Sequence, residues 1–267
     1  HGIEVDYYKK LFQTAGNIIE LIEKDDIPKY LLFLENVFPY MDNYNYQKGM
    51  KAIIQELKNF LKRKDIGTDS DRALLLDFQA TLEIKPEKAI KLEKDALAQI
   101  ENITADNARL VSNLHANLGG LYRMNGHPDL AREHMEKSIS LLDQFNLLHI
   151  NDSIPQIANY AMFLTEQQEP ERGISELQKL SGIIKEYHSD DCLDYAKVQE
   201  TLGTIYLMTA NLPQAKTHFK RAFKIYEKIW TDEPEMIEAK YQEIQELYPQ
   251  VGFFLGQQLS DFLTKQT

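Results

Sequence analysis

Residues 117–142 read NLGGLYRMNGHPDLAREHMEKSISLL and place three small residues, Gly119, Ala131 and Ser138, among bulky ones. On a lone amphipathic helix, small residues with this spacing would leave gaps, but they allow two packed helices to bring their backbones close together. Residues 125–128, Asn-Gly-His-Pro, separate the two halves, and glycine suits a helix end while proline suits a first turn. The stretch therefore predicts a helical hairpin, which cannot bury its apolar side alone.

The hairpin recurs along the chain with a period of 42 residues. The segment 118–122, LGGLY, returns 84 residues later at 202–206 as LGTIY, and 160–164, YAMFL, stands midway between them. Weaker copies surround Asp77 and Gln245. A fixed period of this size, with two helices in each copy, is typical of an α-solenoid.

The repeat resembles the tetratricopeptide repeat family. That family has a small residue at the eighth position of each unit, Tyr at the eleventh, Ala at the twentieth, an aromatic residue at the twenty-fourth and Ala at the twenty-seventh. All five positions are matched by Gly203, Tyr206, Ala215, Phe219 and Ala222. The unit is longer than the usual length of about 34 residues, and in this it is similar to the kinesin-light-chain style of repeat found also in bacterial signalling and regulatory proteins.

The resemblance implies an all-α fold, a right-handed α-solenoid of about five helical hairpins with flanking helices. We expect an N-terminal helix within 1–26, a repeat array over 27–249 and a capping helix at 250–267, whose apolar stripe would either close the stack or bind a partner. The N-terminal helix should span about 3–24. The hairpins are expected at about 27–63, 68–102, 105–146, 150–188 and 191–230, followed by helices at about 233–248 and 250–265.

Composition and charge narrow the class of protein. The chain has 267 residues, of which 43% are hydrophobic and 27% charged, and its net charge of −11 disfavours nucleic acid as a partner. Its single cysteine, Cys192, permits no internal disulfide, and no apolar run approaches the roughly 18 residues that a membrane span requires. We therefore expect a cytoplasmic protein with no membrane partner, and we interpret His1-Gly2 as a cloning remnant on a piece of a larger protein.

No motif of enzyme chemistry stands in the sequence. The seven histidines are scattered, without an H-E-x-x-H pair or a His/Cys cluster that would suit zinc. There is no phosphate-binding glycine loop and no G-x-S-x-G nucleophile signature. The acidic pairs Asp25-Asp26 and Asp190-Asp191 fall at expected helix starts, where they complement the helix dipole. We expect no catalytic residue, no metal and no cofactor.

The resemblance also implies a concave ligand-binding face, built from the first helix of each hairpin. Asparagine at the sixth position, as in Asn117 and Asn159, could bond the backbone of an extended peptide, or could equally bond its own helix. Methionines could give the face an adaptable floor or could pack in the core. Carried over by position, the candidate residues are Asn113, Asn117, Arg123, Met124, Asn159, Met162, Glu166, Lys197, Glu200, Thr204 and Met208.

These observations favour a non-catalytic scaffold or sensor that binds a protein or peptide partner in its groove. It would be a fragment of a larger bacterial regulatory or signal-transduction protein, and other domains of that parent chain are further possible partners. One alternative is a receptor for a short signalling peptide. Another is a purely architectural assembly arm.

Overall fold

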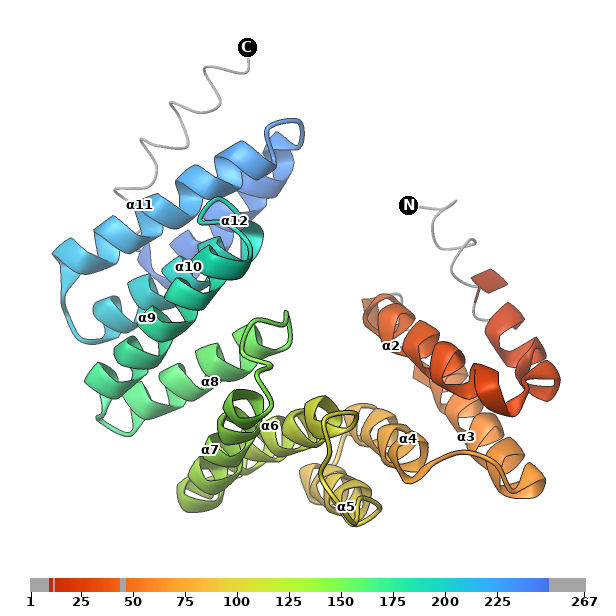
Figure 1. The fold of residues 1–267 in the computed structure, drawn as a ribbon. Coiled ribbons are helices and arrows are strands. Elements are labelled where there is room, and N and C mark those ends of the chain that lie inside the picture. The colour runs from red at the N-terminus through yellow and green to blue at the C-terminus, as the bar shows by residue number, and fades with distance from the viewer. Residues whose placement is uncertain (1–9, 12, 44–46, 250–267) are drawn as a thin grey trace. The chain divides into compact units, whose positions relative to one another are not determined.

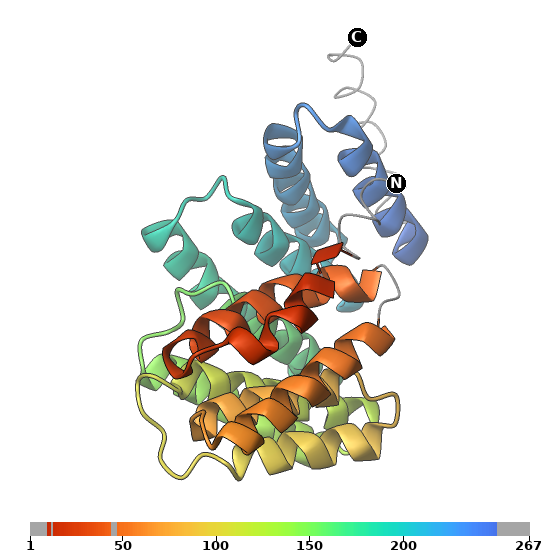
Figure 2. The same ribbon diagram turned by 90° about the vertical axis from the view of Figure 1, so that its right-hand side faces the viewer.

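The structure is a computed structural model that describes residues 10–11, 13–43 and 47–249. Within these ranges every regular element is a helix and there is no strand. Pairs of helices that follow one another, such as α4 and α5 or α10 and α11, run antiparallel as hairpins (Figures 1 and 2). The predicted all-α class is thereby confirmed. The chain divides into two compact units, 1–141 (unit 1) and 142–267 (unit 2), and each is considered by itself.

The helix boundaries lie close to those expected from the 42-residue period. Unit 1 contains α2 (Ile27–Asn43), α3 (Gln47–Lys64), α4 (Asp69–Thr81), α5 (Pro86–Leu97), α6 (Ala108–Met124) and most of α7 (Pro128–Gln144). Unit 2 contains α8 (Ser153–Glu166), α9 (Pro170–Tyr187), α10 (Leu193–Met208), α11 (Leu212–Ile229) and α12 (Pro234–Leu247). The expected helix at 250–265, and with it the capping role of 250–267, lies outside the described residues.

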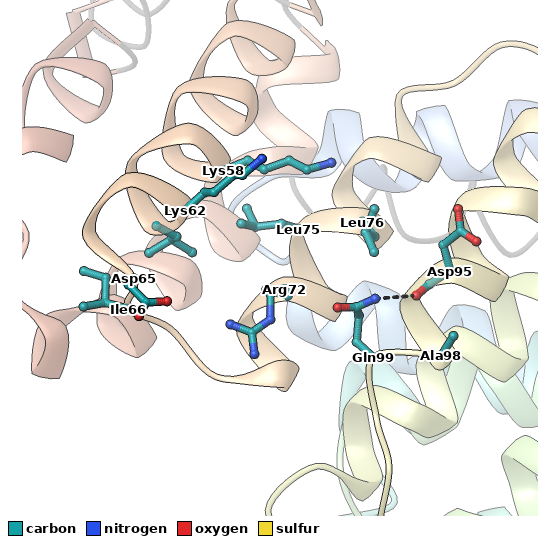
Figure 3. Close-up of a pocket in the computed structure, with 11 residues that line it drawn as sticks. Lys58, Lys62, Asp65, Ile66, Arg72, Leu75, Leu76, Asp95, Ala98 and Gln99 are labelled. Carbon is teal, nitrogen blue, oxygen red and sulfur yellow. Dashed lines mark hydrogen bonds between the residues drawn. The ribbon is translucent and has the colours of Figure 1, made fainter.

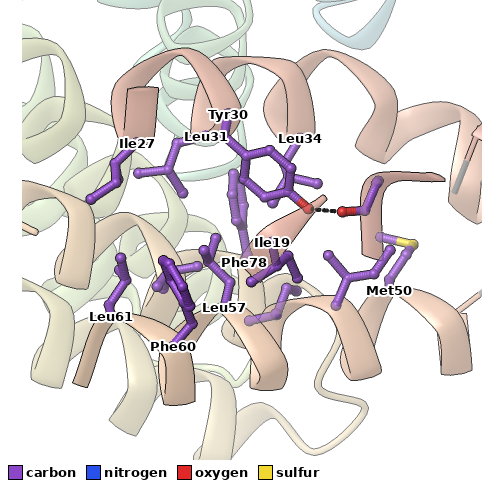
Figure 4. Close-up of a cluster of buried hydrophobic side chains, with 14 of the residues drawn as sticks. Ile19, Ile27, Tyr30, Leu31, Leu34, Met50, Leu57, Phe60, Leu61 and Phe78 are labelled. Carbon is purple, nitrogen blue, oxygen red and sulfur yellow. Dashed lines mark hydrogen bonds between the residues drawn. The ribbon is translucent and has the colours of Figure 1, made fainter. Parts of the chain in front are cut away.

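The N-terminal segment departs from the expected single helix over about 3–24. Its described part is α-helical only up to residue 17 and continues as two short 3₁₀ helices, η1 (Ile19–Leu21) and η2 (Lys24–Asp26). The Tyr30 hydroxyl donates a 2.6 Å hydrogen bond to the Ala15 carbonyl oxygen beside a buried apolar cluster (Figure 4). The predicted helix is therefore wrong at its C-terminal end, because burial of Ile19 and this bond favour a bend that local propensity does not encode.

The turn inside a hairpin repeats its backbone geometry at the same point of three successive repeats. Gly126, Gln168 and Ala210, each 42 residues apart, have positive φ angles of 73°, 64° and 59°. In each turn the next residue donates a backbone hydrogen bond to the carbonyl five residues before it, which is the closing bond of a Schellman motif. These bonds are His127 N to Tyr122 O (2.9 Å), Glu169 N to Leu164 O (2.8 Å) and Asn211 N to Tyr206 O (2.7 Å).

Small residues mark the places where paired helices approach most closely. A Cβ atom added to Gly119 would lie 2.6 Å from Met135 Cγ, and one added to Gly203 would lie 2.8 Å from the Phe219 ring. Both distances are shorter than van der Waals contact. The sequence-based explanation for the small residues in 117–142 is therefore confirmed for Gly119.

Adjacent glycines in α6 provide a matched test of this contact. We expect Gly119→Ala to lower the free energy of unfolding by about 1–3 kcal/mol, because the new methyl group overpacks against Met135. Gly120→Ala should instead raise it by about 0.5–1 kcal/mol, since the added Cβ would have no atom within 4 Å apart from the adjacent residues and backbone of α6, and alanine favours helix. Equilibrium urea unfolding measures both. Equal effects of the two substitutions would contradict the proposed contact.

The left-handed turn at Ala210 gives a second prediction. An alanine in this conformation costs about 1–2 kcal/mol, so Ala210→Gly should raise the free energy of unfolding by about 0.5–1 kcal/mol after the flexibility of glycine in the unfolded chain is subtracted. Ala239→Gly, at an exposed site inside α12, should lower it by about 1 kcal/mol. The melting temperature should rise for Ala210→Gly and fall for Ala239→Gly. A fall in both variants would contradict the left-handed conformation of Ala210.

Candidate functional site

The eleven residues predicted to face a ligand lie on α6, α8 and α10, the first helices of three successive hairpins. Asn113, Asn117, Arg123 and Met124 belong to unit 1, and the other seven belong to unit 2. In unit 2, α8 and α10 pack against each other. The binding role of these residues stays a prediction.

The predicted residues differ in how far their side chains are exposed to solvent. The side chains of Met124 and Met208 are 81% and 48% exposed, so the alternative that they pack in the core is wrong, while Met162 is half-buried. The side chains of Asn159, Glu166 and Lys197 are exposed as well. Thr204 is only 8% exposed and its hydroxyl donates to the Glu200 carbonyl oxygen at 3.1 Å, which leaves it little to offer a partner.

Asn117 already makes hydrogen bonds to the neighbouring hairpin of unit 1. Its side-chain nitrogen donates to Asp77 Oδ1 of α4 at 2.8 Å and to Glu93 Oε1 of α5 at 3.3 Å. A peptide that used the Asn117 amide nitrogen would have to compete with these carboxyl groups. The predicted contact between Asn117 and a peptide backbone therefore requires the peptide to displace the carboxyl groups of Asp77 and Glu93.

The two carboxyl groups to which Asn117 donates, that of the buried Glu93 and that of the half-buried Asp77, form a pair. Glu93 is 2% exposed, and its burial, followed by the charge of Asp77 and the hydrogen bond between the two groups, raises its pKa to about 10. Burial also raises the pKa of Asp77. The pair therefore keeps a proton at neutral pH and carries about one negative charge. Sequence analysis did not select these residues, although both stand at repeat positions that are apolar in the well-matched copies.

Glu200, another predicted site residue, ties three helices of unit 2 together. Its carboxylate accepts a 2.7 Å hydrogen bond from the Tyr226 hydroxyl of α11 and lies 2.9 Å from Lys240 Nζ of α12. Burial opposes the charge of Lys240, but the carboxylates of Glu200 and Glu243 outweigh it and raise the pKa of the lysine. A partner's cation would have to replace an existing one at Glu200.

A histidine pair joins α6 to α7. His115 Nδ1 and His134 Nδ1 lie 2.8 Å apart, and the His134 ring stacks on Tyr122. In α10 and α11, at the same repeat positions, His218 stacks on Tyr206 and is 2.9 Å from an oxygen of Gln199. Burial, followed by the charges of His134 and Lys137, lowers the pKa of His115 to about 4, so both rings are neutral at pH 7.

The histidine pair generates a pH prediction. The unfolded chain takes up a proton at His115 near pH 6.5, whereas the folded chain does so only near pH 4, so the stability is complete above pH 6.5 and is lost as the pH falls toward 4. His115→Gln copies the Gln199–His218 arrangement. Between pH 7.5 and pH 5 the free energy of unfolding should fall by about 1 kcal/mol less in this variant than in wild type, a figure reduced because the ring is partly exposed. Urea unfolding at each pH measures this. His127→Gln, at an exposed ring, is the control, and a wild-type pH dependence in His115→Gln would contradict the assignment.

A cavity of about 530 Å³ opens between α3, α4 and α5 in unit 1 (Figure 3). Its apolar lining comes from Leu61, Ile66, Leu75, Leu76 and Ala98. Its charged lining comes from Lys58, Lys62, Arg72, Asp65 and Asp95. None of the eleven predicted residues lines it. An apolar group with a charged end is the ligand type that such a lining suits.

The described part of the chain has neither a metal-binding cluster nor a membrane-spanning helix. Among its residues, no group of three His, Cys, Asp or Glu side chains is arranged to hold a metal ion. No helix within 10–11, 13–43 and 47–249 is long and apolar enough to cross a membrane.

Comparisons with known proteins agree with this architecture. Residues 153–228 match the family model of the tetratricopeptide repeat. No curated protein matches the chain at a significant level. Among solved structures, a kinesin-light-chain-type array of nearly identical TPR-like repeats from Podospora anserina is 12% identical, with a TM-score of 0.58 over 76% of this chain and 98% of that one. BtubC (BKLC) from P. vanneervenii is 16% identical, with a TM-score of 0.56 over 90% of this chain and 89% of that one. At these identities the likeness concerns the fold.

Proposed function

We propose, from the premise that this chain belongs over residues 153–228 to the tetratricopeptide repeat family, that it is a non-catalytic scaffold or sensor that binds a protein or peptide. Stacked helix pairs of this kind present extended binding surfaces, and they do so without catalytic groups. The chain would use the first helices of its hairpins for this purpose. We place it in the cytoplasm, as a fragment of a larger bacterial regulatory or signal-transduction protein.

The observation that carries the proposal is the set of exposed side chains on those first helices. A methionine that is 81% exposed, Met124, and one that is 48% exposed, Met208, lie at equivalent ends of α6 and α10. An exposed methionine is costly in water and is favoured where it can adapt to a partner's surface. In unit 2, Met208 is accompanied by exposed Asn159, whose amide offers hydrogen bonds, and by exposed Lys197, whose Nζ lies 3.5 Å from Asp194 Oδ1.

Site-specific photocrosslinking tests this surface. Benzoylphenylalanine would replace Met208 on the first helix of its hairpin or Gln178, an exposed residue on the second helix α9. We expect adducts to a partner from Met208 and not from Gln178 in the same cell extract. Met208→Ala should then weaken binding of the purified partner by about tenfold, or about 1.4 kcal/mol, as measured by titration calorimetry.

The outcomes separate the proposed function from its alternatives. A protein adduct at Met208 supports the scaffold, and a short peptide adduct supports the receptor for a signalling peptide. Adducts formed only with other copies of this chain would support the architectural arm. Equal adducts at both positions, or adducts at Gln178 alone, would contradict binding through the first helices.

A further inference from the structure

The cavity between α3, α4 and α5 lies at the end of the shorter helix α5. α3 has 18 residues and α5 has 12, so α5 is shorter by about 9 Å. α4 packs against both helices, and the cavity opens beside the end of α5, where Asp95, Ala98 and Gln99 line it. Its volume of about 530 Å³ is far larger than the gaps that close packing leaves in a protein interior, and it is typical of a small-molecule site.

The lining combines apolar and charged side chains. On α3, Lys58, Leu61 and Lys62 are spaced three and four residues apart and therefore share one face of the helix. On α4, Leu75 is buried and Leu76 is half-buried. An apolar surface therefore lies beside charged groups, as in sites that bind amphiphilic small molecules.

Two lysines of α3 bring like charges together in this lining. Their side chains extend from the helix in the same direction (Figure 3). Among the residues that the structure describes, Lys62 Nζ has no hydrogen bond or ion pair, and Lys58 Nζ has only a 3.4 Å bond to the neutral amide of Gln79. Like charges one helical turn apart repel each other. An anion bound between the two ammonium groups would remove that repulsion.

The other charged groups of the lining do not form an equivalent site for a cation. Arg72 donates a 3.1 Å bond from Nη1 to the Gly67 carbonyl oxygen and pairs with Asp69, so its charge is already balanced. Asp65 and Asp95 lie on opposite sides of the cavity (Figure 3). A cation would therefore meet one carboxylate at a time, whereas an anion can meet two ammonium groups on one helix face.

Gln99 places a further requirement on a ligand. Its Nε2 atom donates a 3.3 Å hydrogen bond to the Asp95 carbonyl oxygen, and its side-chain oxygen points toward Arg72 (Figure 3). Within the described ranges no donor bonds to that oxygen. An N–H group of a bound ligand can supply the donor, because an amide oxygen accepts hydrogen bonds.

We propose that this cavity binds a small carboxylate with an apolar body and an amide N–H group, such as an N-acylated amino acid. Lys58 and Lys62 hold the carboxylate, and the apolar body packs on Leu75 and Leu76. A monocarboxylate fits better than a phosphate monoester, because Asp65 and Asp95 repel a second negative charge. The site goes beyond the proposed function, since it uses none of the residues on α6, α8 and α10 that are assigned to a partner.

Nuclear magnetic resonance titration of the whole chain, with labelled methyl groups, tests the proposal. The probe is N-octanoylglycine, and the matched control is N-octanoylglycinamide, which has the same length and the same acyl amide without the charge. We expect the probe to shift the methyl signals of Ile66, Leu75 and Leu76 to saturation, with an affinity about tenfold higher than that of the control. The methyl signals of Leu32, which is 53% exposed on α2, should stay in place and so show that the acyl chain does not adsorb generally.

Three variants assign the binding to particular side chains. Lys58→Met/Lys62→Met removes both ammonium groups at exposed positions, so it should remain folded by circular dichroism. Its affinity for N-octanoylglycine should fall about tenfold, while its affinity for the glycinamide should stay the same. Lys64→Met, at the exposed last residue of α3 outside the cavity, is the control for charge and should leave both affinities unchanged. Ala98→Trp, at an exposed position, should fill the cavity and abolish the methyl shifts from both probes.

A wild-type chain without a saturable shift from N-octanoylglycine would overturn the site, and so would equal affinities for the two probes. An undiminished response in Ala98→Trp would place the binding elsewhere. A loss in Lys64→Met as large as that in the double variant would remove the role of Lys58 and Lys62. The proposed function stands or falls separately, because the crosslinking position Met208 lies in unit 2 and is no part of this site.

Discussion

The close approach of the two helices in the hairpins α6–α7, α8–α9 and α10–α11 is the constraint on which the other features depend. A Cβ atom placed on Gly173 would stand 2.6 Å from the Ala161 carbonyl oxygen, so no larger residue fits there without a shift of α8 or α9. Because protein interiors are densely packed, this spacing determines which bulky residue lies opposite and where the connecting turn must reverse. The left-handed turn at Gln168 is the local consequence, since the chain has to re-enter the second helix at that distance.

Helix pairs with the same backbone arrangement carry residues of different chemical character at equivalent positions. An apolar pair, Gly203 and Phe219, and an acidic pair, Asp77 and Glu93, occupy equivalent places. Their consequences for stability differ, because only the acidic pair is linked to pH. The raised pKa of Glu93 means that its contribution to stability is complete below about pH 4.5 and is lost as the pH rises toward 10. The histidine pair acts in the opposite direction and destabilises the fold in acid.

Some side chains on the first helices form hydrogen bonds to other helices, and others are exposed to solvent. Glu200 and Asn117 each bond to other helices of their own unit, which gives them a structural role whatever else they bind. Met124 and Met208, at the C-terminal ends of their helices, are exposed. A binding surface on this protein would accordingly combine fixed polar groups near the helix middles with adaptable apolar groups near the helix ends.

The sequence by itself determined the fold class, the 42-residue period and the hairpin boundaries. It could do so because these depend on local signals: small residues at a fixed spacing, proline at helix starts such as Pro128, and glycine at turns such as Gly126. The exposure of Met124 was left open by the sequence, since methionine suits both a core and a surface.

Only the tertiary structure decided which polar groups meet. The bonds from Asn117 to Asp77 and Glu93 join residues 40 and 24 positions away on different helices, and the His115–His134 pair spans 19 positions. No local pattern encodes such distances, because they arise from the way in which two helices pack within a hairpin, for the histidines, and in which one hairpin packs on the next, for Asn117. The early end of the N-terminal helix has the same origin: the burial of Ile19 and the hydrogen bond from Tyr30 to Ala15 outweigh helix propensity that the sequence alone favours.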